Sequence, residues 1–269
     1  MSQTLPVTSA TRRAVLRPFP EPFTVQILLP AYNEASALPT MLESLESMFR
    51  QARLSYHVTV VDDGSQDDTA RIARKAERNL PLTLIQHPVN QGLAAAMRTG
   101  LRSLAAASSL DDIIVTMDCD NTHPIGLIPR MLQEIHEGRD VVVASRFQSQ
   151  SRVMGVPAFR QLTGIGAAVL FKLLFPIKGV RDYTCGFRAY RADAVRRAFD
   201  EYGDDFISEQ GFTCMVDILL KLSRLQMICS EVPMVLRYDQ KVGQSKMPVG
   251  KTVRQSLRLA FRRRVGILD

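Results

Sequence analysis

The chain of 269 residues contains no tryptophan, and its aromatic residues make up only 7% of the sequence. Proteins that bind nucleic acid often stack bases on aromatic side chains set among basic ones. Here the basic residues lack interleaved aromatics and belong to no recognised module, so nucleic acid is not an expected partner. The cysteines show none of the paired short spacings of a zinc cluster or a disulfide scaffold; they are Cys119, Cys185, Cys214 and Cys229.

Long apolar runs are also missing. No run reaches the roughly 20 residues needed to cross a bilayer, and the N-terminus lacks the apolar core of a signal peptide. We therefore expect a cytoplasmic protein in a reducing compartment, either soluble or peripheral on the cytosolic face of a membrane. The net charge of +7 favours anionic partners such as phosphates and lipid headgroups.

The apolar content of 46% is enough for one large core. Short apolar runs suited to buried strands occur at residues 25–29, 57–61, 82–85, 113–117 and 140–144. Segments with helical spacing or composition lie between them, at residues 38–48, 70–77 and 93–107. This alternation predicts an α/β fold in a single domain, with a mostly parallel sheet flanked by helices and joined by right-handed crossovers.

The two ends of the chain differ from the predicted domain, which we place at residues 23–247. Residues 1–22 are polar and rich in proline, and we expect a flexible arm. Residues 248–269 predict a basic amphipathic helix, which either lies on an anionic membrane leaflet or closes the domain as a solvated helix. The apolar segment 164–175 is too short to span a bilayer and indicates either a core helix or a flap against the membrane.

Two carboxylates follow the apolar run at residues 113–117. Asp118 and Asp120 are one residue apart, so they point the same way at the carboxyl end of a predicted strand, where open α/β sheets collect ligands. Their hard oxygen atoms suit Mg²⁺ or Mn²⁺ with room left for diphosphate oxygens. Asp63 follows the second predicted strand and is expected to hold a nucleobase or ribose. The alternative for these acids is a solvated turn.

Several motifs together resemble those of family 2 glycosyltransferases, which have the GT-A fold. In the first half of the chain they are residues 30–34, 61–69, 90–100, 118–124 and 144–146. Residues 182–188, 231–233 and 243–246 resemble the branch of the family that contains dolichol-phosphate mannose synthase and other polyprenyl-phosphate glycosyltransferases. The resemblance covers roughly residues 25 to 247. It is specific because the motifs occur jointly.

The resemblance implies a Rossmann-like GT-A domain and a metal-dependent, inverting transfer of a sugar from a GDP- or UDP-sugar to a polyprenyl phosphate. It implies Mg²⁺ or Mn²⁺ as cofactor, with Asp118 and Asp120 as metal ligands and with both, together with Arg146, as catalytic residues. Arg146 and Arg160 would contact the acceptor phosphate. The implied nucleotide-binding residues are Pro30, Tyr32, Glu34, Asp63, Asp118 and Lys246.

Three positions depart from the pattern of this branch: Gly164, Cys185 and Gln240. The branch has serine at the first two and arginine at the third, so the donor base and the acceptor stay open. A phosphate acceptor is already ionised and needs no strong base, whereas a hydroxyl acceptor needs a carboxylate to take its proton. The acids available for that task in the second half are Asp182, Glu209 and Asp217.

Two other functions are alternatives. The Asp118-x-Asp120-x-Thr122 pattern also occurs in haloacid-dehalogenase-like phosphatases, where the first aspartate is the nucleophile. Those chains usually carry it on their first strand, whereas three predicted strands precede it here. A catalytically inactive nucleotide-binding scaffold is the second alternative, suggested by the three departures.

Overall fold

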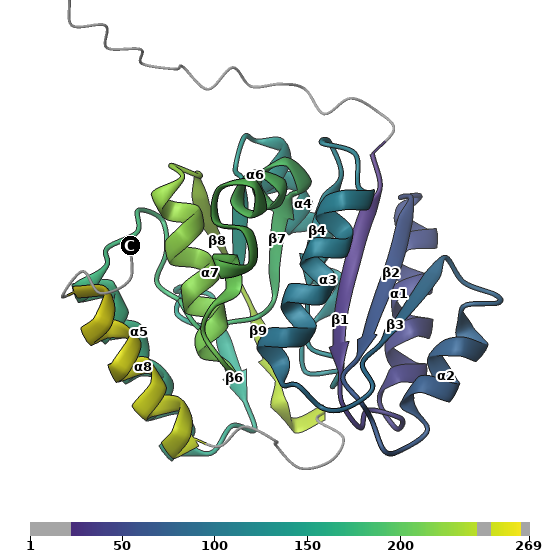
Figure 1. The fold of residues 1–269 in the computed structure, drawn as a ribbon, viewed down its shortest axis with the longest axis horizontal. Helices are drawn as coiled ribbons and strands as arrows, with labels where there is room; N and C mark the ends of the chain where they lie inside the picture. The colour runs from purple at the N-terminus through teal and green to yellow at the C-terminus, as the bar shows by residue number, and fades with distance from the viewer. Residues whose placement is uncertain (1–22, 241–248, 265–269) are drawn as a thin grey trace, which may run out of the picture.

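The structure, a computed structural model, describes residues 23–240 and 249–264. The predicted N-terminal arm and the predicted phosphate contact Lys246 lie outside the described residues. Figure 1 shows a central sheet with helices on both faces. A pair of helices, α5 (Ala158–Leu174) and α8 (Val249–Arg264), packs together at one end of the molecule.

Seven strands form the main sheet of the described chain, in the order β3-β2-β1-β4-β7-β5-β8. Neighbouring strands are parallel except around β7, which runs antiparallel to both β4 and β5. The strands are β1 Val25–Ala31, β2 Tyr56–Asp62, β3 Leu82–Gln86, β4 Ile113–Thr116, β5 Val141–Ser145, β7 Arg188–Arg191 and β8 Cys229–Pro233. A separate parallel pair joins β6 (Arg152–Met154) to β9 (Val235–Arg237).

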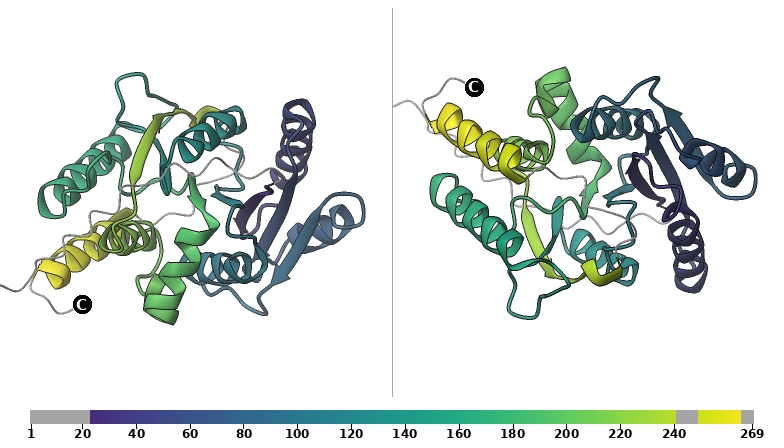
Figure 2. Two further views of the ribbon diagram at one scale, coloured as in Figure 1. Left: turned by 90° about the horizontal axis from the view of Figure 1, so that it is seen from above. Right: turned by 90° about the horizontal axis from the view of Figure 1, so that it is seen from below.

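Helices cover both faces of the sheet. Helices α3 and α6 pack together on one face, whereas α1 and α4 lie on the other (Figures 1 and 2). The bounds of the remaining helices are α1 Leu38–Ala52, α2 Thr69–Ala76, α3 Leu93–Ala107, α4 Ile128–His136, α6 Ala192–Tyr202 and α7 Thr213–Arg224. Short 3₁₀ helices occur at η1 Ile125–Leu127, η2 Gly203–Ile207 and η3 Tyr238–Gln240.

The predicted strands are all present, and their bounds shift by at most two residues. Strands β4 and β5 are buried at every position, because helices cover both faces of the mostly parallel sheet. This burial explains why their sequences are continuous apolar runs. The mostly parallel α/β fold in a single domain is therefore confirmed.

Helix α5 contains residues 164–174 of the predicted apolar segment and is not a core helix. Only Ala168 and Phe171 of α5 are buried, and the rest of its surface is half-buried or exposed. Helix α8 packs against α5 and α7 through a buried face that includes Leu259 and Ala260. Among the described residues, no helix combines the length and the apolar character that crossing a membrane requires.

Candidate active site

The loop after β4 carries the two predicted metal ligands. Asp120 is buried, and its Oδ1 accepts hydrogen bonds from Thr122 N at 3.1 Å and Thr122 Oγ1 at 2.7 Å. Asn121 between them adopts a left-handed conformation at φ 62°, and its side-chain amide donates to Ala37 O at 3.1 Å. These contacts fix the loop. The Asp118 side chain, 36% exposed, stays open to solvent at the carboxyl edge of the sheet.

His123 lies in the same loop and contacts Asp118 twice. Its Nδ1 accepts a hydrogen bond from Asp118 N at 3.1 Å, and its Nε2 lies 3.8 Å from Asp118 Oδ2. The ring stacks on Phe187, with centroids 5.1 Å apart. The sequence analysis included His123 only as part of the motif at residues 118–124 and assigned it no role. Its position five residues after Asp118, within one short loop, is the signal that could have found it.

The donor chemistry of Asp118 and Asp120 fits a hard divalent cation. Within the described residues, no group of three or more histidine, cysteine, aspartate and glutamate side chains could enclose a metal ion. Mg²⁺ usually binds through one or two carboxylates and completes its shell with waters and substrate phosphates. A pair of carboxylates with one open to solvent is the arrangement that such an ion needs.

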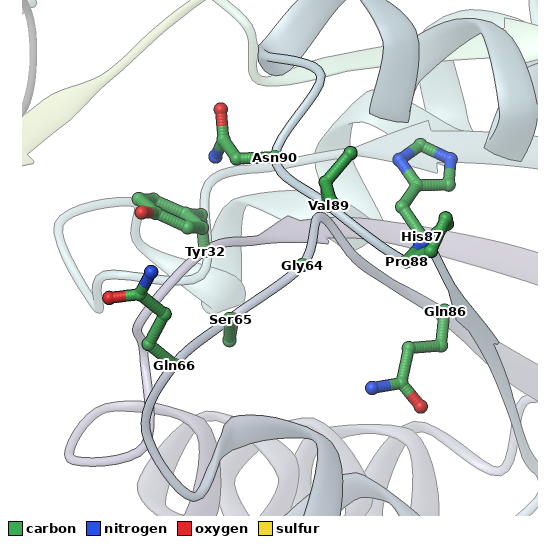
Figure 3. Close-up of a pocket in the computed structure, with 9 residues that line it drawn as sticks. All are labelled: Tyr32, Gly64, Ser65, Gln66, Gln86, His87, Pro88, Val89 and Asn90. Carbon is green, nitrogen blue, oxygen red and sulfur yellow. The ribbon is translucent and has the colours of Figure 1, made fainter.

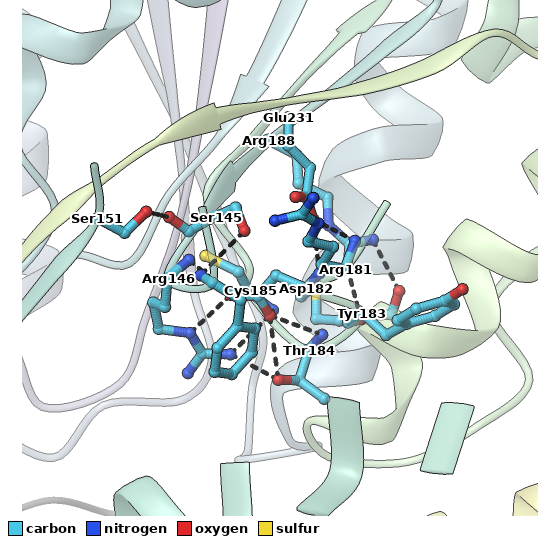
Figure 4. Close-up of polar contacts among 12 residues, drawn as sticks. Ser145, Arg146, Ser151, Arg181, Asp182, Tyr183, Thr184, Cys185, Arg188 and Glu231 are labelled. Carbon is cyan, nitrogen blue, oxygen red and sulfur yellow. Dashed lines mark hydrogen bonds and ion pairs between the residues drawn. The ribbon is translucent and has the colours of Figure 1, made fainter. Parts of the chain in front are cut away.

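Arg146 follows β5 and is held by Asp182. Its Nε and Nη2 donate to the two oxygens of the Asp182 carboxylate at 2.8 and 2.7 Å, and Nη2 also donates to Thr184 Oγ1 at 2.6 Å (Figure 4). Burial opposes both charges, but each ion stabilises the other. Asp182 therefore raises the pKa of Arg146 above its ordinary value, and Arg146 lowers the pKa of Asp182. The pair stays charged at neutral pH.

Asp182 is fully buried and accepts further hydrogen bonds from the backbone N–H groups of Arg146, Thr184 and Cys185. It is thus the buried partner of Arg146, an arrangement that disfavours its use as a general base. Glu231 holds the same segment, because its Oε1 accepts from Arg181 N and Asp182 N. Burial, followed by the charge of Asp182, raises the pKa of Cys185 to about 12, so this departure from the family is a neutral thiol.

The segment that carries Asp182 also passes beside Asp118. A Cβ on Gly186 would lie 3.5 Å from Asp118 Oδ1, and Gly186 O accepts a hydrogen bond from Thr116 Oγ1 at 2.7 Å. The charge of Asp118 is one of the negative charges that raise the pKa of Arg146. The fold therefore brings Asp118 and the loop that holds Arg146 together.

A pocket of about 490 Å³ opens beside this site, between the ends of β1, β2 and β3 (Figure 3). Its lining residues are Tyr32, Gly64, Ser65, Gln66, Gln86, His87, Pro88, Val89 and Asn90. Gly64 has φ +68°, and a Cβ there would lie 2.4 Å from the backbone carbon of Val89. Only glycine allows the two walls to approach this closely.

Asp63 shapes this pocket from behind. It is 2% exposed, and its Oδ1 accepts from Gln91 N at 2.9 Å and lies 2.7 Å from His87 Nδ1. Its Oδ2 accepts from Gly92 N at 2.7 Å. Its carboxylate therefore holds the loop that forms one wall. The expected direct contact of Asp63 with a base or ribose stays a prediction.

Three more of the predicted nucleotide contacts, Pro30, Tyr32 and Glu34, lie at or just after the end of β1. Tyr32 lines the pocket, and Pro30 pairs in register with Val61 of β2. Glu34 is half-buried, and its backbone N–H donates to Thr69 Oγ1 at 2.8 Å. The turns after β1 and β2 are thus tied into one rim.

Arg160 lies in the first turn of α5, and its Nη1 donates to Tyr238 OH at 2.8 Å. The contact joins α5 to the segment after β9. Gly164, one turn later, has open space where a side chain would stand.

The two remaining candidate bases belong to an ion cluster beneath α8. Asp217 is fully buried between Lys221 and Arg263, so it is a structural residue. Burial and the nearby charge of Asp217 raise the pKa of Glu209, whose carboxylate also lies 3.8 Å from Arg262.

Comparison with known proteins agrees with this geometry. The model of the family described as glycosyl transferase family 2 matches residues 26–199. The dolichol-phosphate mannosyltransferase of Pyrococcus furiosus is 28% identical over 239 residues, which cover 88% of this chain and 63% of that protein. The undecaprenyl-phosphate mannosyltransferase of Micrococcus luteus is 30% identical over 227 residues, 84% of this chain and 88% of that protein. The chain therefore spans less than two thirds of the archaeal relative.

Solved structures of glucosyl-3-phosphoglycerate synthase from Mycobacterium tuberculosis share the fold. One, in complex with Mn²⁺, UDP and phosphoglyceric acid, is 23% identical with a TM-score of 0.64, covering 92% of this chain and 80% of that one. Another, in complex with Mg²⁺ and UDP, is 22% identical with a TM-score of 0.63, covering 92% and 81%.

Proposed function

The chain belongs to glycosyl transferase family 2 and has the GT-A fold, and we propose that it transfers a sugar from a nucleoside-diphosphate donor to a polyprenyl phosphate. The observation that carries this proposal is the placement of Arg146 beside Asp118. A cation-binding carboxylate and a fixed guanidinium on the same edge of the sheet suit a reaction between two phosphorylated substrates.

The donor occupies the pocket rimmed by the turns after β1 and β2. Tyr32 offers an aromatic face to the nucleobase, and Asp63 keeps the opposite wall in place through Gln91 and Gly92. The diphosphate then extends toward Asp118. Asp118 and Asp120 would hold Mg²⁺ or Mn²⁺, which would supply Lewis-acid stabilisation of the charge on the leaving diphosphate.

The acceptor side carries the positive charge of Arg146, and each of the three candidate bases, all within the described residues, lies beside a basic residue. Arg146 donates hydrogen bonds from Nε and Nη2 to Asp182 and Thr184. Its Nη1 is the donor that we assign to an acceptor phosphate. Asp182 and Asp217 are both held in buried ion pairs, which argues against a hydroxyl acceptor that must lose a proton. A phosphate oxygen needs positioning alone and attacks the anomeric carbon in line, with inversion.

A polyprenyl acceptor lies in a membrane, and α5 and α8 present a matching surface. Both helices expose large apolar side chains, which we call the apolar face: Phe159, Leu162, Ile165, Val169 and Leu173 on α5, and Val253, Leu257 and Phe261 on α8. On α5 these residues recur at helical spacing, and the buried residues Ala168 and Phe171 lie on the other side. Exposure of the apolar face to water is unfavourable, and surfaces of this kind mark interaction sites.

The charge on α8 supports an anionic lipid leaflet as the occupant of the apolar face. Arg254 and Arg258 are exposed on α8, and each directly follows a residue of the apolar face, Val253 and Leu257 respectively. An interfacial helix buries its apolar side chains in the acyl region while basic residues contact headgroups. The peripheral position on the cytosolic face of a membrane that was expected from the sequence is part of this proposal.

The activity is tested by incubating the full chain with Mn²⁺ and either a UDP- or a GDP-sugar, with and without a polyprenyl phosphate. We expect lipid-linked sugar only with the lipid. Asp118→Asn and Asp120→Asn should each lose at least about a hundredfold in turnover, roughly 2.7 kcal/mol of barrier. Asp193→Asn, on the surface of α6, is the matched control and should keep full activity.

Three results would contradict the proposal. Transfer to a hydroxyl without any lipid phosphate would exclude the acceptor, and nucleotide binding without sugar release would indicate the inactive scaffold. A phosphoenzyme trapped by beryllium fluoride would indicate a phosphatase.

Membrane docking is tested by flotation with phosphatidylcholine vesicles that contain or lack phosphatidylglycerol. Leu257→Gln combined with Phe261→Gln removes side chains that are 54% and 65% exposed. Burying the exposed part of each side chain in the membrane contributes about 1 kcal/mol to the free energy of binding, so the affinity for vesicles should fall about 30-fold. Leu110→Gln, at an apolar residue exposed to 50% before β4, should change nothing. Loss of a dimer in the double variant with unchanged flotation would show that the face joins two copies.

A further inference from the structure

We infer that His123 is the positioning residue that sets the direction of the Asp118 carboxylate. The inference rests on the proposed function in one respect, the role of Asp118 as a cation ligand. It assigns a task to a buried side chain that the transfer reaction does not use directly. His123 is 7% exposed, and both of its ring nitrogens approach Asp118.

The hydrogen bond between the two residues fixes the tautomer of the ring. The backbone N–H of Asp118 can only donate, so Nδ1 of His123 must carry no proton. The remaining proton of a neutral ring is therefore on Nε2. This is the nitrogen that lies 3.8 Å from Oδ2 of Asp118. One ring thus accepts from the main chain of Asp118 and presents an N–H toward its carboxylate.

The ring itself cannot turn. It stacks on Phe187 with an interplanar angle of 17°, and Phe187 is fully buried. Gly186, which precedes Phe187, passes close to Asp118, since a Cβ at this position would lie 3.5 Å from Asp118 Oδ1. Phe187 O also accepts a hydrogen bond from Ala144 N at 2.9 Å, which ties it to β5. His123 therefore orients Asp118 relative to the strand that leads to Arg146.

Hydrogen-bonding partners behind a metal ligand are worth 10–100-fold in metal affinity when they are removed. With His123 replaced, the Asp118 side chain can rotate among its rotamers, and the cation must fix it on binding. We expect the loss to appear in the affinity for the cation. Turnover at saturating cation should recover, because the inference gives the ring a positioning task and no direct task in the transfer.

The experiment measures Mn²⁺ binding by the electron paramagnetic resonance signal of free Mn²⁺, with UDP in one arm and GDP in the other. His123→Phe keeps the stack on Phe187 and removes both nitrogen contacts, so affinity should fall about 10–100-fold. His123→Asn keeps an acceptor near the position of Nδ1 and should recover part of the loss. His57→Asn, at a half-buried position on β2, is the control and should match the parent.

A merely structural role predicts a different pattern. In that case His123→Phe would lower the melting temperature but, measured well below it, would bind Mn²⁺ like the parent. That result overturns the inference. A parent that binds Mn²⁺ but transfers sugar to a hydroxyl would refute the proposed acceptor and leave the inference standing. A parent that binds no Mn²⁺ with either nucleotide overturns both.

Discussion

The buried ion cluster beneath α8 should respond very differently to neutralisation from a surface pair of equal length. Asp217 accepts from Arg263 Nη2 at 2.6 Å and from Lys221 Nζ at 3.0 Å. It also accepts from Ser208 N, Ser208 Oγ and Glu209 N. The side chains of Asp217, Lys221 and Arg263 are 0%, 5% and 3% exposed. Asp217→Asn removes the negative charge and places an amide N–H against donors.

The expected cost follows from burial. Removing one partner of a buried ion pair destabilises a protein by about 3–5 kcal/mol, because the remaining charge stays desolvated. At roughly 2–4 °C per kcal/mol for a chain of this size, the melting temperature should fall by about 10 °C. Asp204 provides the matched control. It pairs with Arg102 at the same 2.6 Å, but its side chain is 81% exposed, so Asp204→Asn should cost about 0–1 kcal/mol.

The assay is urea unfolding of both variants and the parent, with hydrogen exchange of α8 as a second measurement. Since Arg263 is a residue of α8, Asp217→Asn should also speed exchange in that helix. Equal destabilisation by the two substitutions would refute the reasoning, because burial would then not decide the strength of the pair. Unchanged exchange in α8 would show that Asp217 does not hold this helix.

Two further predictions concern the pocket rim and the pH dependence of stability. Gly64→Ala should lower the free energy of unfolding in urea by about 1–3 kcal/mol and weaken nucleotide binding in calorimetry, because its Cβ would meet the backbone of Val89. Gly164→Ala should instead stabilise the protein by up to about 1 kcal/mol, because this mid-helix position of α5 has open space for a side chain. A stabilising Gly64→Ala and a destabilising Gly164→Ala would refute this reasoning. Burial raises the pKa of Glu209, so the folded state binds its proton more tightly than the unfolded state, and parent stability is lost as pH rises from about 4.3 through the raised pKa. Glu209→Gln should therefore become more stable relative to the parent over that window, and a constant difference would contradict the shift.

The sequence predicted the five strands that are continuous apolar runs and missed four others of the described chain, of which β7 lies in the middle of the main sheet. Strands β1 to β5 are short apolar runs because helices bury both faces of the sheet. Strand β7 reads Arg-Ala-Tyr-Arg, a polar run, yet Arg188 is fully buried. Its guanidinium donates to Met215 O at 2.7 Å and Tyr183 O at 2.8 Å. Met215 lies 27 residues further along the chain, so no local pattern indicates that an arginine can occupy this strand.

Site residues were predictable to the extent that strand ends determine them. Asp118 and Arg146 follow β4 and β5, whose carboxyl ends share an edge, and Tyr32 follows β1. The use of each carboxylate was not predictable. Asp63 and Asp182 both turn into the protein, where each accepts hydrogen bonds from backbone N–H groups of another segment. Which acid faces solvent is decided by tertiary contacts of this kind.

The antiparallel direction of β7 is what joins the two halves of the site. Arg188, the first residue of β7, pairs with Thr116 near the carboxyl end of β4 and with Val143 of β5. The segment 182–187 therefore enters the sheet at the edge where β4 and β5 deliver Asp118 and Arg146. Entry at that edge lets Asp182 bind Arg146 while Gly186 passes Asp118. A parallel β7 would begin at the opposite edge, a strand length away from both, and Arg146 would lack its carboxylate partner.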